Sequence, residues 1–136
     1  TVLGDQIWSI LQDRAGRLWV GSVQAGAAWR DADGHWHGVP GFSGYANGAR
    51  HPTVRDMLEV ADDKVWIATD GNGVIEYTPG HPATHAIAHD PAVHSSLPGD
   101  SVRSLLLDRA GNLWVATDLG VARTHRGIHT AFSLLP

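Results

Sequence analysis

Short apolar runs alternate with glycine, aspartate and proline along the chain. Three such runs cover Ile7 to Leu11, Thr53 to Val60 and Val102 to Leu107. Apolar runs of this length between turn-forming residues favour β-strands over helices. Sixteen Gly and seven Pro in 136 residues also interrupt the chain too often for long helices. The pattern therefore predicts an all-β protein.

A short motif centred on tryptophan occurs three times along the sequence. Trp19, Trp66 and Trp114 each occupy the second position of a short apolar stretch that ends in Ser or Thr, and they are separated by 47 and then 48 residues. An aliphatic residue lies 12 residues before each of them. Agreement at so many offsets indicates three copies of one structural unit.

Each unit predicts four short strands. The apolar run is the first strand and the tryptophan motif is the second. A third strand follows a glycine. An Asp-x-x-Gly turn joins the first two strands in the first and third units, whereas the middle unit has Val60 to Asp63 there. In such a turn the Asp caps the backbone and the Gly adopts a positive φ. The weaker fourth strands are predicted at His35 to Val39, His85 to His89 and Ile128 to Leu134.

A four-stranded repeat of about 47 residues is typical of a β-propeller blade. We predict an all-β, partial β-propeller over 1–136, with three four-stranded antiparallel blades at about 4–50, 51–98 and 99–136. A β-sandwich is the alternative. The three repeated tryptophans are expected to be buried between blades, and Trp29 and Trp36 to be more exposed.

Three blades are too few for a closed ring, so two blade faces are expected to remain uncovered. We expect self-association through these faces as a dimer or trimer, since two copies would supply six blades. Coverage by a larger partner is the alternative.

The third unit resembles the two-component regulator propeller repeat. It contains a Leu-Pro start at Leu97, a Val-Arg-Ser strand at Val102, and an Asp-x-x-Gly-x-Leu-Trp stretch from Asp108 to Trp114. The first unit matches this core, and the middle unit departs from it. The resemblance implies three repeats of a longer bacterial signalling receptor. It also implies a periplasmic or otherwise extracytoplasmic, non-enzymatic sensor whose histidine kinase or diguanylate cyclase output lies outside this chain.

Composition excludes several other classes of function. Ten Lys and Arg against 14 Asp and Glu leave a net charge of −4 and no basic stripe, so nucleic acid is not an expected partner. No apolar run approaches the roughly 20 residues of a membrane helix. Cysteine is absent, which excludes thiol catalysis and thiolate metal sites. No phosphate-binding loop or nucleophile pattern is present, and no cofactor is predicted.

The propeller topology places candidate ligand-binding residues at one end of the blades. The loops before the first strand and between the second and third strands share that end, where propellers usually bind ligands. Arg55 and Arg103 occupy equivalent positions in the first strand, and Trp8 replaces them in the first unit. Guanidinium groups and an indole suit a carboxylate or a sugar ring, so a small-molecule or glycan ligand is predicted. Alternatively, the arginines bond loop carbonyls. The predicted ligand residues are Trp8, Gln24, Arg55, Asp70, Asn72, Arg103 and Asp118.

Histidines offer two weaker interpretations. His35 and His37 share a strand face, as do His85 and His89, but two His on an outer strand are more often ordinary surface residues, and no metal site is predicted. A propeller lyase or hydrolase would need a channel-side His, for which His51 and His94 are the candidates. A protein-interaction scaffold without a small-molecule ligand is the third hypothesis.

Overall fold

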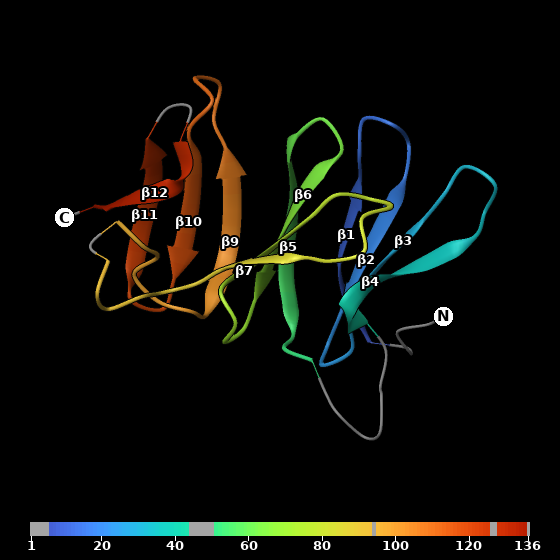
Figure 1. Cartoon of the computed structure of the whole chain (residues 1–136), viewed down its shortest axis with the longest axis horizontal. Helices are drawn as coiled ribbons and strands as arrows, with labels where there is room; N and C mark the ends of the chain where they lie inside the picture. The colour runs from blue at the N-terminus through green and yellow to red at the C-terminus, as the bar shows by residue number, and fades with distance from the viewer. Residues whose placement is uncertain (1–5, 44–50, 94, 126–127, 136) are drawn as a thin grey trace.

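The computed structural model describes residues 6–43, 51–93, 95–125 and 128–135, and within them twelve strands form three four-stranded antiparallel sheets (Figure 1). The prediction of an all-β fold with three four-stranded repeats is confirmed. In every sheet the four strands follow one another in sequence order. The strands are β1 (Ile7–Gln12), β2 (Leu18–Ser22), β3 (Gly26–Arg30) and β4 (Trp36–Ser43); β5 (Val54–Ala61), β6 (Lys64–Thr69), β7 (Val74–Tyr77) and β8 (His85–Ile87); and β9 (Val102–Leu107), β10 (Leu113–Thr117), β11 (Gly120–His125) and β12 (Ile128–Leu134).

The three sheets stack face to face in chain order, as a fan (Figure 1). The inner strand of the middle sheet, β5, lies against both β1 and β9. One apolar core lies between the first and second sheets and a second lies between the second and third. The sheets fall within the three predicted blade ranges, although the blade boundaries themselves stay a prediction.

Each sheet has a leading face toward the preceding sheet and a trailing face toward the following one. Met57 and Leu105, on the leading faces of the second and third sheets, are buried in the two cores. Ile10 occupies the equivalent position on the first sheet and is 69% exposed. On the trailing side, Leu58 packs into a core, whereas the equivalent Leu106 is 58% exposed. Among the described residues, the stack therefore has two open ends: the leading face of the first sheet and the trailing face of the third.

The tryptophans follow the same rule. Trp19 and Trp66 are completely buried on trailing faces, as predicted. Trp114 is half-buried, because the described residues supply no sheet against the trailing face on which it lies. The prediction for Trp29 was wrong. It is buried because β3 turns it toward the second sheet, where its ring lies 6.0 Å from that of Trp19. Trp36 is half-buried against the leading face of the first sheet.

The predicted hairpin turns are present at one end of the sheets. Gly16 and Gly111 adopt φ values of 88° and 85°, as the Asp-x-x-Gly pattern requires. The middle sheet turns through Asp62 and Asp63 instead, with Asp63 at φ 60°. The register shifts between Glu59 and Ala61 at this turn. Before it, the pairs Met57–Ile67 and Glu59–Val65 keep the register of the equivalent pairs in the first sheet.

Candidate ligand-binding rim

Every inner strand carries a β-bulge at the same repeat position. In the first sheet, Ile7 pairs with Ser22 and Ser9 with Gly21, which leaves Trp8 without a strand partner. The extra residue of a bulge departs from the strict alternation of a strand, and its side chain is re-aimed. The two other sheets repeat this arrangement around Arg55, between the pairs Val54–Thr69 and Asp56–Ala68, and around Arg103, between Val102–Thr117 and Ser104–Ala116.

Each bulge arginine forms an ion pair with the aspartate that follows the second strand of its own sheet. Arg55 Nη2 donates to Asp70 Oδ2 at 2.9 Å, and Arg103 Nε donates to Asp118 Oδ1 at 2.5 Å. The first sheet has Val23 at the aspartate position. A carboxylate is therefore present in the two sheets that have an arginine and absent from the sheet that has Trp8.

These groups form a continuous line across the three sheets. The Arg55 guanidinium lies 5.8 Å from the centre of the Trp8 ring, within the range of a cation–π contact. The hydrogen bond from Arg55 is the main reason that the pKa of Asp70 lies below its usual value, and Arg103 lowers it further by its charge. A β-bridge between Asp70 and Ser101 joins the second and third sheets at this point. We call Trp8, Arg55, Asp70, Arg103 and Asp118 the rim.

The rim is an open surface. Trp8 is 60% exposed, and the Arg103 side chain is 56% exposed. No pocket is found among the described residues. The hydrogen bond that Arg103 donates to the Asp118 carboxylate raises the pKa of the Arg103 guanidinium. The surface thus offers an indole beside fixed donors and acceptors, without a deep cavity.

The remaining predicted residues lie at the same end of the sheets. Gln24, in the β2–β3 turn, is exposed with φ 63°, and its carbonyl accepts a hydrogen bond from the His51 backbone. Asn72 is exposed in the β6–β7 turn, where its backbone N–H bonds to Thr69. The His51 ring packs edge-on against Phe42 at 5.4 Å. His94 lies outside the described residues. The structure brings five of the seven predicted ligand residues together and places Gln24 and Asn72 in neighbouring turns.

The sequence carries a signal for these bulges. Strict alternation puts residues two apart on one face. Val54 and Met57, like Val102 and Leu105, are three apart, yet both members of each pair are buried. An apolar spacing of three at the start of a strand is what one inserted residue produces.

The family comparison matches two segments of the chain. Residues 1–24 and 96–118 match the family model described as two component regulator propeller. These are the segments that carry the motif in the first and third units, so the resemblance stated above is confirmed there. Among curated proteins no relative matches the chain.

Solved structures show the same fold. The extracellular domain of a B. thetaiotaomicron protein described as a hybrid two component system, BT3049, matches 99% of this chain at 22% identity and a TM-score of 0.72. The extracellular domain of a second such protein from that organism, BT4673, matches 98% at 18% identity and a TM-score of 0.67. PorZ of Porphyromonas gingivalis, a surface component of the type-IX secretion system, matches 85% at 19% identity and a TM-score of 0.59.

The chain spans 17%, 20% and 17% of the lengths of these three proteins. At such identities the likeness shows the fold. The described residues contain no helix long and apolar enough to cross a membrane. Taken together, the stacked four-stranded sheets show propeller-type blades, and the family match identifies residues 1–24 and 96–118 as segments of two-component regulator propeller repeats.

Proposed function

We propose that this chain is a non-enzymatic sensory segment of a bacterial signal-transduction receptor, located outside the cytoplasm, and that its rim contacts the ligand. The observation that carries the proposal is the β-bulge repeated in all three inner strands, which aligns Trp8, Arg55 and Arg103 across the sheets. A bulge costs ladder hydrogen bonds, and bulges often re-aim side chains beside functional sites. The family match supports the receptor context.

The charges of the rim favour a neutral, hydroxyl-rich ligand over a carboxylate. Both arginines already hold a carboxylate, so an anionic ligand would have to displace Asp70 or Asp118. A sugar ring would instead stack on the exposed Trp8 indole and share hydroxyl hydrogen bonds with the ion-paired groups. A sugar or oligosaccharide is therefore the ligand class that we propose.

Saturation-transfer NMR with neutral oligosaccharides and small carboxylates tests the rim. We expect transfer to a neutral sugar that falls several-fold in Trp8→Ala and in Arg103→Gln. Arg109→Gln is the matched control, because Arg109 is an exposed arginine in the turn at the opposite end of the third sheet. Transfer that is equal in all variants would place the binding site elsewhere. An absence of transfer from every compound would favour the scaffold hypothesis, and turnover that depends on His51 or His94 would favour the enzyme.

We also propose that the two open ends of the stack pair between copies of this chain. Both internal interfaces place the trailing face of one sheet on the leading face of the next. The described residues leave one face of each kind uncovered, marked by Ile10 on the leading side and by Leu106 and Val121 on the trailing side. Light scattering is expected to show a discrete dimer or trimer. A single species near 14.6 kDa would contradict the pairing, and a larger covering protein would then be the candidate partner.

A further inference from the structure

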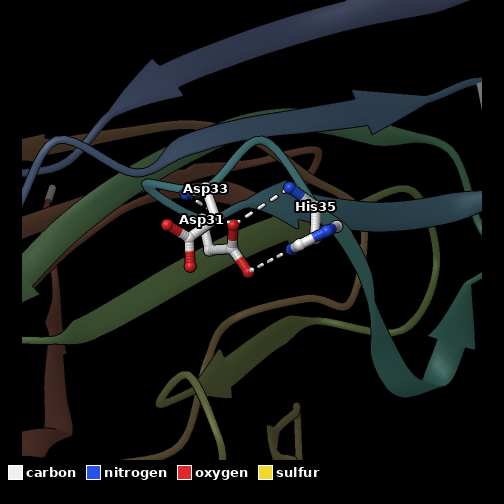
Figure 2. Close-up of side chains that lie close together, drawn as sticks. All are labelled: Asp31, Asp33 and His35. Atoms are coloured by element: carbon white, nitrogen blue, oxygen red, sulfur yellow. Dashed lines mark hydrogen bonds and ion pairs between the residues drawn. The ribbon is translucent and has the colours of Figure 1, made fainter.

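The β3–β4 turn gathers four metal-binding side chains at the end of the first sheet opposite the rim. Candidate ligand atoms of Asp31, Asp33 and His35 all lie within 4.8 Å of one another (Figure 2). His37, two residues further along on β4, places its Nε2 2.7 Å from Asp31 Oδ2. The sequence showed His35 and His37 on one face. The turn adds the two carboxylates that complete a set of four donors.

Two other turns in the molecule show what this geometry does when it has a purely structural role. Asp13 begins the β1–β2 turn, and its Oδ2 accepts hydrogen bonds from the side chains four and six residues later, Arg17 Nε and Trp19 Nε1. Asp108 begins the β9–β10 turn, and its Oδ2 accepts from Asn112 and Trp114 at the same two offsets. In both turns the groups that face Oδ2 are donors without metal-binding capacity.

The β3–β4 turn has imidazoles at these two offsets. His35 Nδ1 lies 3.8 Å from Asp31 Oδ2, and His37 Nε2 lies 2.7 Å from the same oxygen. Unlike an indole, a guanidinium or an amide NH₂, a neutral imidazole carries a nitrogen lone pair and is the commonest metal ligand in proteins. In the β3–β4 turn, the same turn geometry therefore brings two nitrogen donors to one shared carboxylate oxygen.

The supporting contacts hold two of the ligands in place. Asp31 Oδ1 accepts hydrogen bonds from the backbone N–H groups of Asp33 and His35, which leaves Oδ2 directed at the imidazoles. The His37 ring stacks on the buried Trp29 with 4.3 Å between ring centres. Zinc bonds of about 2.0–2.2 Å separate tetrahedral donors by roughly 3.3–3.6 Å. The separations of 2.7 and 3.8 Å from Asp31 Oδ2 to the two imidazoles bracket that range. His37 lies outside the group of three whose ligand atoms are all within 4.8 Å of one another, so binding would require the 76% exposed His35 side chain to turn toward it.

We propose that Asp31, His35 and His37, with Asp33 as the fourth ligand, bind one divalent transition-metal ion of the zinc class. Two imidazoles and two carboxylates favour Zn²⁺ over Ca²⁺, which takes six to eight oxygen ligands. The ion would link the turn to the outer strand β4. The site lies away from the rim and does not rest on the proposed ligand-binding function.

Isothermal titration calorimetry with zinc chloride on the whole chain at neutral pH tests this site. We expect one zinc ion per chain, and an affinity that falls in His35→Gln and in His37→Gln by more than the ~10–100-fold typical for loss of an outer-shell partner. His85→Gln is the matched control, since His85 is an exposed strand histidine on β8. Circular dichroism checks that both variants remain folded, which we expect because the two imidazoles are exposed.

Other results would overturn the assignment. Zinc binding that is absent, or that is unchanged in the double variant of His35 and His37, would exclude this site. Equal heats for Ca²⁺ and Zn²⁺ would show carboxylate binding without the imidazoles. Loss of zinc binding in His85→Gln would place the ion on β8. Asp33→Asn then tests the fourth ligand, with a smaller loss of affinity expected than from either histidine.

Discussion

The middle sheet and the two outer sheets are built from the same repeat, yet they differ in how much of their apolar surface is covered. Leu58 packs against the third sheet, whereas Leu106, at the same repeat position, is 58% exposed. Met57 is 5% exposed, and the equivalent Ile10 is 69% exposed. Residue type is nearly constant across these positions. The presence of a neighbouring sheet therefore decides burial, as is usual in repeat proteins.

The two internal interfaces also differ in their polar contacts. Between the first and second sheets, Arg14 and Arg17 reach Asp62 and Asp63 at the turn end. Between the second and third, Asp56 Oδ2 accepts a hydrogen bond of 2.9 Å from the Leu105 backbone at the rim end. The unusual turn of the middle unit thus supplies the carboxylates for the first interface.

The largest predicted effect compares two equivalent tryptophans. Trp66→Ala removes a completely buried ring and is expected to lower the free energy of unfolding by about 3–5 kcal/mol. Trp114→Ala removes a half-buried ring from an open face, and we expect a loss of roughly 1 kcal/mol. Urea unfolding followed by circular dichroism measures both. Equal losses would mean that the trailing face of the third sheet is covered in solution.

An intermediate effect is expected from the turn carboxylates. The Asp13 side chain is fully buried and accepts hydrogen bonds from Arg17 and Trp19, so Asp13→Asn is expected to cost about 1.5–3 kcal/mol. Asp108 makes the equivalent bonds in a more exposed turn, and Asp108→Asn is expected to cost less. Urea unfolding at neutral pH compares the two. A larger cost for Asp108 would contradict this order.

The same carboxylate predicts a pH dependence. Burial alone would raise the pKa of Asp13, but the hydrogen bonds from Trp19 and Arg17 and the charge of Arg17 together lower it. A folded-state pKa below the unfolded value of about 3.9 stabilises the fold above that pH, and this stabilisation is lost as the pH falls through the folded-state pKa. The difference between wild type and Asp13→Asn should therefore shrink on acidification. A constant difference would exclude the charge of Asp13 as its cause.

The smallest effect on stability tests the open faces. Leu106→Lys is expected to change the free energy of unfolding of the monomer by no more than ~0.5 kcal/mol, because the side chain is mostly in solvent. If the open faces pair between copies, the same change should convert the oligomer to monomer in light scattering. Val93→Lys is the control, since Val93 is an exposed apolar residue of the β8–β9 connection and belongs to no strand of either open face. Dissociation by both variants would indicate a non-specific charge effect.

Much of this fold was predictable because residues close together in the sequence specify each strand and turn of the repeat. All twelve strands were placed to within a few residues by the apolar runs, the tryptophan motif and the turn glycines. This works because strand and turn preferences depend on near neighbours in the chain. The rim positions also followed from the repeat, because equivalent residues occupy equivalent places. Gln24 and Asn72 share that end of the sheets, but turn positions do not specify where a side chain points.

The sequence by itself determined the number of sheets, the order of their strands and the positions of the hairpin turns. Tertiary structure alone decided what depends on contacts between sheets. Trp29 is buried because the second sheet lies against it, and Gly21 replaces the alanine of the other units because Val54 fills the space of a Cβ. It also decided the pairing of Arg55 with Asp70 and of Asp31 with His37, since a bulge or a turn sets the direction of a side chain through backbone geometry.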